Sequence, residues 1–285
     1  MGDVGVEPLL RDTVSVALRE DLLPIGDITS FLIPEGATAV ATFVARQNGV
    51  LAGMDTVREV IRQIDPLLEL EILLEDGAAV SQNSSLAILR GNLRSIVTSE
   101  RTALNFLSHL SGIASRTNLF VEKIKNVSTK TKILDTRKTI PGLRFLEKAA
   151  VRAGGGYNHR GNLSEAVMIK DTHLAILDIQ EAVAKARSMW PGRFIEVECE
   201  TVGQVTEAAM AGSDIVMFDN MTVEAAKSAK ETLLALKNCR LPLIEVSGGV
   251  DMDNIVEYAK LDVDFISLGT ITNSAHSLDI GLDIL

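Results

Sequence analysis

The sequence has little cysteine, no basic excess and no long apolar run. Two cysteines in 285 residues, Cys199 and Cys239, exclude a disulfide framework and favour a reducing compartment. No apolar run reaches the ~18 residues of a membrane span. The first residues lack the basic and apolar segments of a secretory signal. The formal net charge of −10 argues against nucleic acid, because an acidic surface repels a polyanion. We therefore expect a cytoplasmic protein that binds neither nucleic acid nor membrane.

One window of this acidic chain is nevertheless basic. Residues 130–173 hold nine Lys or Arg and four Asp or Glu, so the window carries +5 and the rest of the chain −15. A local positive field inside an acidic protein indicates a small, multiply charged anion as ligand. The residues that stand out are Arg137 and Lys138 in DTRKTIPGLR, His159 and Arg160 in GGGYNHRGN, and Lys170 in VMIKD.

The first hundred residues predict a mixed α+β layer. Residues 12–21 have a helical pattern, whereas alternating, β-branched segments predict strands within 37–53, 68–80 and 80–91. A helical pattern then runs from Ile96 to about Lys125, and Ser111-Gly112 is a candidate break in it.

After residue 130, short apolar runs alternate with amphipathic helical segments. This rhythm predicts a parallel sheet with right-handed crossovers, and six runs in a row favour a barrel over an open doubly wound sheet. The runs are 132–135, 166–170, 194–198, 214–219, 242–248 and 264–269.

Polar or glycine residues follow each of these six strands. In an α/β barrel the carboxyl ends of all strands meet at one face, where active sites are built. One polar strand end is usually a solvated cap, but six together favour a pocket. The residues concerned are Asp135 to Lys138, Lys170-Asp171, Glu198, Asp219-Asn220, Ser247 to Gly249, and Gly269-Thr270.

The residue types at these ends suit two different ligand groups. Arg137, Arg160 and Lys170 match the carboxylates of a di- or tricarboxylate. Glu198 and Asp219 are hard oxygen ligands for a Mg²⁺-chelated diphosphate or for sugar hydroxyls. Glycine-rich ends of the last two strands are typical phosphate sites. His109 and His276 have no partner signal, and we expect them to be structural or surface residues.

The chain resembles the quinolinate phosphoribosyltransferase family over nearly its whole length. The segments that carry the resemblance include EDLLPIGDITS (20–30), SERTALNFLSHLSGIAS (99–115), DTRKTIPGLR (135–144), GGGYNHR (154–160), IKD (169–171), EVEC (196–199) and EVSGGV (245–250). The resemblance implies an N-terminal α+β sandwich domain over 1–100 and an incomplete (open) α/β barrel over 101–271. The tail, about 272–285, would pack back on the first domain.

The resemblance also implies an activity and a set of site residues. The reaction joins quinolinate to phosphoribosyl pyrophosphate and gives nicotinate mononucleotide, pyrophosphate and CO₂ in NAD synthesis, with Mg²⁺ carried largely by the diphosphate. A homodimer, or a higher oligomer, would share active sites. The implied quinolinate ligands are Arg137, His159, Arg160, Lys170 and Arg101 of the neighbouring subunit. The implied ligands of the phosphosugar and its metal are Thr136, Lys138, Glu198 and Asp219, with Ser247, Gly248, Gly249, Leu268, Gly269 and Thr270 at the 5-phosphate. Lys138, Lys170, Glu198 and Asp219 would be the catalytic residues.

Some positions depart from the family pattern, and other functions stay open. The departures are Gly161-Asn162 after NHR, Thr172 after IKD, and Asn273, which puts a histidine role near the phosphate in doubt. One alternative is a related phosphoribosyltransferase that accepts another aromatic acid. A second is a Schiff-base lyase with Lys170 as the nucleophile. A third is a binding protein without catalysis.

Overall fold

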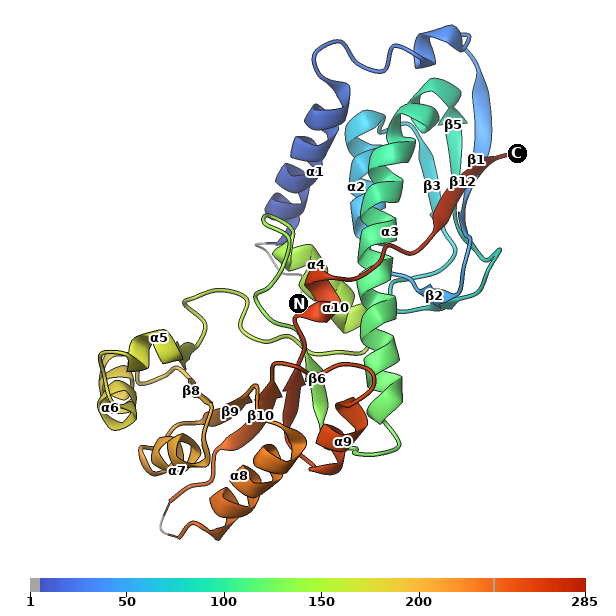
Figure 1. Cartoon of the computed structure of the whole chain (residues 1–285). Helices are drawn as coiled ribbons and strands as arrows, with labels where there is room; N and C mark the ends of the chain where they lie inside the picture. The colour runs from blue at the N-terminus through green and yellow to red at the C-terminus, as the bar shows by residue number, and fades with distance from the viewer. Residues whose placement is uncertain (1–5, 238) are drawn as a thin grey trace. The chain divides into compact units, whose positions relative to one another are not determined.

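The computed structural model describes residues 6–237 and 239–285. The chain divides into two compact units (Figure 1). The first contains residues up to Asn118, together with Thr139–Gly155 and Thr270–Leu285, and the second contains Leu119–Lys138 and Gly156–Gly269. In the described part of the chain, no helix is long and apolar enough to cross a membrane.

The first unit is built on an antiparallel sheet in the order β12-β1-β5-β3. The expected strands within 37–53, 68–80 and 80–91 are confirmed, and the final residues add β12 beside β1. Figure 1 shows α2 and α3 beside this sheet. The elements are α1 (Val6–Leu22), η1 (Ser30–Leu32), β1 (Thr38–Ala45), β2 (Gly49–Val50), α2 (Met54–Ile64), β3 (Glu69–Ile72), β4 (Ala79–Val80), β5 (Ser85–Asn92), α4 (Arg144–Ala153), α10 (Thr270–Asn273) and β12 (Ile280–Ile284).

The long helix α3 (Leu93–Ile124) corrects one expectation. It runs without interruption through Ser111-Gly112, so the predicted break is wrong. Gly112 is needed for a close approach: a Cβ there would lie 2.1 Å from the carbonyl oxygen of His276. The glycine therefore marks tight packing on a continuous helix.

The second unit is an open parallel sheet with flanking helices. All six strands predicted after residue 130 are confirmed, and their order is β6-β11-β10-β9-β8-β7. Since β6 and β7 end this order, the predicted incomplete barrel is confirmed. The strands are β6 (Lys132–Leu134), β7 (Val167–Ile169), β8 (Ile195–Cys199), β9 (Ile215–Asp219), β10 (Leu243–Ser247) and β11 (Phe265–Ser267). The helices are α5 (Asp171–Leu174), α6 (Ile179–Met189), α7 (Val202–Met210), α8 (Val223–Ala235) and α9 (Ile255–Lys260).

Local sequence chemistry fixes where these crossover helices begin. Asp178, Thr201 and Thr222 precede α6, α7 and α8, and each side chain accepts a backbone N–H three residues later. Such caps satisfy donors that a helix N-terminus leaves unpaired. Because every strand is parallel to its neighbours, the strand ends that precede these helices lie on one face.

Candidate active site

A cavity of about 430 Å³ lies in the second unit at the carboxyl ends of its strands. Residues from all six strand ends, or from the loops after them, line it together with His159 and Arg160. The lining residues are Thr136, Arg137, Lys138, His159, Arg160, Met168, Lys170, Glu198, Met217, Asp219, Asn220, Ser247, Gly248 and Ser267.

One part of the lining is cationic. Arg160 is half-buried, and its Nη1 donates to the carbonyl oxygen of Ala166 at 2.9 Å. Its Nε is buried and has no hydrogen-bond acceptor among the described residues. Burial, and then the nearby charge of Arg137, lower the pKa of Arg160. A buried donor beside a second guanidinium is suited to a negatively charged ligand group.

Acidic and glycine residues form another part of the lining. Glu198 ends the buried run of β8 and pairs with the ammonium group of Lys170. Asp219 and Ser247 end the neighbouring strands β9 and β10, where they are paired in register. A cation, carboxylates and a glycine turn are therefore available together to one ligand.

Gly248 holds its position in the turn after β10 because it has no side chain. Its φ is +81°, and a Cβ there would lie 2.1 Å from Oδ1 of Asn220. Asn220 is itself fixed, since its backbone N–H donates to the Ser247 carbonyl at 2.9 Å. In this turn the backbone of Gly248 lies at the edge of the cavity, with no side chain to cover it.

We expect Gly248→Ala to reduce the free energy of unfolding by about 1–2 kcal/mol, from the left-handed backbone alone, with the clash adding to it. Thermal unfolding would measure this. Gly192→Ala is the matched control, because Gly192 is exposed and a Cβ there meets no atom within 4 Å. Equal losses of stability in the two variants would contradict the assignment of strain to Gly248.

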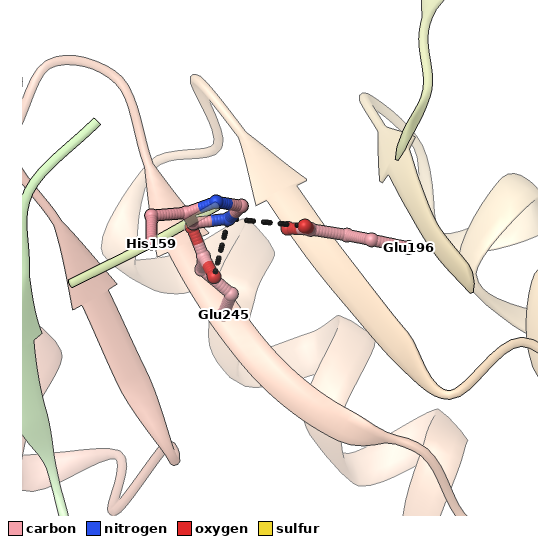
Figure 2. Close-up of side chains that lie close together, drawn as sticks. All are labelled: His159, Glu196 and Glu245. Carbon is pink, nitrogen blue, oxygen red and sulfur yellow. Dashed lines mark ion pairs between the residues drawn. The ribbon is translucent and has the colours of Figure 1, made fainter. Parts of the chain in front are cut away.

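His159 reaches from the cavity to two buried acids (Figure 2). Its Nε2 lies 3.0 Å from Glu196 and 3.5 Å from Glu245. Burial opposes charge on the ring, but hydrogen bonds and charges from both acids outweigh it and raise the pKa of His159 to about 10. Burial, and then the charge of Glu245, raise the pKa of Glu196 to about 7. Because Nδ1 accepts the backbone N–H of Arg160 at 2.7 Å, it carries no proton, so we place the ring proton on Nε2 and the second proton of the trio on the carboxyl groups, in line with the raised pKa of Glu196.

The structure brings together ten of the candidate site residues predicted from the sequence. The cavity is lined by Thr136, Arg137, Lys138, His159, Arg160, Lys170, Glu198, Asp219, Ser247 and Gly248. Gly249, Leu268 and Gly269 are not among its lining residues, and the Leu268 backbone N–H is used by the Leu134 carbonyl. Arg101 is exposed on α3 and Thr270 begins α10, both in the first unit.

Some residues at the site have a role that the sequence did not predict. Asp135, noted only as a polar strand end, is fully buried and accepts from the His159 backbone at 2.8 Å and from the Asn158 amide at 2.7 Å. Glu196 and Glu245 lie below the cavity. The alternation of side chains along a strand could have identified Glu196, because Glu196 faces the same side of β8 as Glu198, which lies two residues further along.

Two family models together match most of the chain. The model described as quinolinate phosphoribosyl transferase, C-terminal domain, matches residues 113–283, and the N-terminal domain model matches residues 27–111. The chain belongs to the quinolinate phosphoribosyltransferase family. In this member of the quinolinate phosphoribosyltransferase family, the residues that line the cavity all lie in the part matched by the C-terminal domain model.

Similar proteins support membership of the quinolinate phosphoribosyltransferase family over the full length. A probable nicotinate-nucleotide pyrophosphorylase [carboxylating] of Methanocaldococcus jannaschii is 38% identical, covering 97% of this chain and 99% of that protein. The Mycobacterium leprae enzyme of that name is 37% identical, with 96% of each chain covered. The structure of the nicotinate-nucleotide pyrophosphorylase from Francisella tularensis matches with a TM-score of 0.91 at 40% identity, covering 98% of this chain and 96% of that one.

Proposed function

We propose that this chain transfers a phosphoribosyl group from phosphoribosyl pyrophosphate to quinolinate with decarboxylation. The products are nicotinate mononucleotide, pyrophosphate and CO₂, so the enzyme serves NAD synthesis. The observation that carries the proposal is the composition of the cavity. It holds Arg137, Arg160 and Lys170 together with Glu198, Asp219 and a glycine turn. These groups suit a dicarboxylate and a phosphosugar in one site.

Quinolinate binds at the cationic part of the cavity. Its two carboxylates are costly to bury unless they are paired. Arg137, His159, Arg160 and Lys170 supply this pairing, and the buried Nε of Arg160 is a donor that awaits an acceptor. Guanidinium forks match carboxylates in two-point contacts, which adds geometric selectivity for the acid.

Phosphoribosyl pyrophosphate binds at the acidic part. Lys138 and Thr136 contact its diphosphate, and Glu198 and Asp219 contact the ribose hydroxyls. Backbone N–H groups of glycine-rich turns approach phosphate closely. The 5-phosphate site in this proposal is the turn at Ser247 and Gly248, which lines the cavity. The neighbouring Gly249 and the segment Leu268 to Thr270 after β11 are part of the proposal by family resemblance and do not line the cavity.

The donor set fits Mg²⁺ that arrives with the substrate. Glu198 and Asp219 are the two carboxylates among the described residues that line the cavity. Mg²⁺ is commonly held by one or two carboxylates while it keeps waters and substrate phosphates. These two residues would hold the ion, which would neutralise charge on the diphosphate.

The chain's own residues stabilise the charges that develop during transfer. The pyridine nitrogen forms a bond to C1 of the ribose as the bond from C1 to the diphosphate oxygen breaks. Glu198 and Asp219 stabilise the positive charge on the sugar, and Lys138 stabilises the departing diphosphate. Holding both substrates in one cavity lowers the entropic part of the barrier. Loss of CO₂ then leaves an electron pair on the ring carbon beside the cationic nitrogen, and that carbon takes up a proton.

The assembly completes the site in this proposal. Arg101 is exposed on α3 and is not among the residues that line the cavity. This supports a homodimer, or a higher oligomer, in which Arg101 of one subunit contacts quinolinate held by the other.

The proposed domains and location have separate support. The two family models meet between residues 111 and 113, close to the proposed boundary at residue 100. The pairing of β12 with β1 supports the return of residues 272–285 to the first domain. The two free cysteines are compatible with the cytoplasm.

The expected result of an assay is that purified protein releases CO₂ and pyrophosphate in equal amounts from quinolinate, phosphoribosyl pyrophosphate and Mg²⁺. Chelation with EDTA should stop release of both products, because the diphosphate loses its counter-ion. Radiolabelled quinolinate and a pyrophosphate assay measure the two products. Pyrophosphate release with nicotinate in place of quinolinate would indicate another aromatic-acid acceptor. Release of neither product from the full mixture would refute the function.

A further inference from the structure

Two carboxyl groups are buried beneath the cavity. Glu196 precedes Glu198 by two residues on β8, and Glu245 precedes Ser247 by two residues on β10. Their exposed fractions are 2% and 0%, and neither lines the cavity. Since strand residues two apart face the same side, these acids form a layer below the residues at the opening. His159 connects that layer to the cavity.

The ring of His159 is held at both nitrogens. Nε2 lies 3.0 Å from an oxygen of Glu196 and 3.5 Å from an oxygen of Glu245, as Figure 2 shows. Nδ1 accepts the backbone N–H of Arg160 at 2.7 Å. The ring therefore links the buried acids to the backbone of the residue whose guanidinium lines the cavity.

The spacing of this trio also resembles a metal site, because its ligand atoms lie within 4.8 Å of one another. A histidine that binds a metal usually donates its other ring N–H to an acceptor. Here Nδ1 is itself an acceptor, so the ring proton belongs to Nε2, the atom that faces the acids. Hydrogen bonding therefore explains this arrangement better than metal binding.

Burying two carboxyl groups beneath the cavity is energetically unfavourable. Glu196 Oε1 and both carboxyl oxygens of Glu245 are buried without a hydrogen-bond partner among the described residues. Well-packed apolar residues are often more stabilising than such buried charges. Met217, the neighbour of Glu245 in register on β9, is buried and shows that an apolar residue fits this layer. The acids are therefore better explained by what they do to His159.

We propose that Glu196 and Glu245 are positioning residues for the dicarboxylate substrate. Glu196 accepts the Nε2–H of His159, and the carboxyl group of Glu245, 3.5 Å away, attracts the same Nε2–H. The ring is thereby fixed so that Nδ1 accepts the Arg160 backbone N–H and both side chains keep one orientation toward the substrate. The proposal rests on the proposed function, which supplies the identity of that substrate. Neither acid contacts the reacting atoms.

Steady-state kinetics of Glu245→Gln and Glu196→Gln test this role. We expect KM for quinolinate to rise about tenfold in each variant, with KM for phosphoribosyl pyrophosphate and kcat changed less than about twofold. Ser213→Ala is the control, because the buried Ser213 hydroxyl has no hydrogen-bond partner among the described residues and lies outside the cavity lining. If Glu245→Gln does not fold, the quinolinate KM of Glu196→Gln alone tests the role. Equal rises in both KM values would overturn the role.

A double-mutant cycle separates positioning from general packing. If Glu245 acts through His159, the Glu245→Gln/His159→Asn variant should have the same quinolinate KM as His159→Asn alone, whereas independent effects multiply. Multiplied effects would therefore overturn the proposal.

The ring itself gives a spectroscopic test. With four histidines in the chain, ¹⁵N NMR should show His159 with Nε2 protonated and Nδ1 unprotonated. A protonated Nδ1, or a stoichiometric metal ion in the purified protein, would contradict the arrangement. A parent enzyme that releases no CO₂ would refute the proposed function. An active parent with unaltered glutamine variants would refute only the positioning role.

Discussion

Arg137→Ala is expected to weaken quinolinate binding about 100-fold, because truncating one partner of a buried charge pair leaves the other unpaired. Arg137 lines the cavity close enough to Arg160 to lower that residue's pKa, so both guanidinium groups belong to one anion-binding part. Binding of phosphoribosyl pyrophosphate should change little, since its proposed contacts lie at other residues. Calorimetric titration with each substrate alone measures the two affinities.

Arg193→Ala is the control for this experiment. Arg193 is an exposed arginine of the same unit and does not line the cavity, so its loss changes the net charge without changing the site. Losses of equal size for both substrates in Arg137→Ala would contradict the assignment of Arg137 to the dicarboxylate.

Asp219→Asn is expected to reduce kcat about 100- to 1,000-fold, the effect typical of removing one preorganised group that stabilises transition-state charge. Asparagine keeps the size of the side chain but removes the negative charge that faces the sugar. Quinolinate affinity, measured alone by titration, should stay close to that of the parent. Single-turnover kinetics would locate the loss in the chemical step.

Asp253→Asn is the matched control, because Asp253 is exposed in the turn after β10 and is not part of the cavity lining. A normal kcat in Asp219→Asn, or a loss confined to quinolinate binding, would refute the proposed role of Asp219.

The lyase alternative is weakened by the partner of Lys170. A nucleophilic lysine needs a neutral amine, whereas Glu198 forms an ion pair with the Lys170 ammonium group. The Lys170 amine is therefore engaged by a carboxylate and suits charge pairing better than nucleophilic attack.

The sequence was most informative where burial and local chemistry coincide. The six strands after residue 130 were predicted because a parallel strand covered on both faces has a nearly continuous apolar pattern. Polar residues directly after each strand then identified most of the cavity lining. In contrast, Gly112 was misread as a helix break, since a glycine required for close packing and one that ends a helix look alike in sequence.

The layer below the cavity depends on distances that a single sequence does not contain. In EVE, residues 196–198, both acids face the same side of β8, yet Glu196 is 2% exposed and the Glu198 side chain 14%. Only the fold brings Glu196 within reach of His159 and of Glu245, which lies 49 positions further along the chain. Their joint role was therefore invisible before the strands were arranged in space.

The open edge of the barrel has a consequence for how specificity can change. Arg137, His159 and Arg160 lie on loops between β6 and β7, the two strands that end the sheet order. Glu198 and Asp219 instead lie at the carboxyl ends of β8 and β9, which have hydrogen-bonded neighbours on both sides. Substitutions of Arg137, His159 or Arg160 can therefore alter acceptor recognition without disturbing the interior strands that carry Glu198 and Asp219. The fold thus places the proposed acceptor residues beside the sheet edges and the two cavity acids on interior strands.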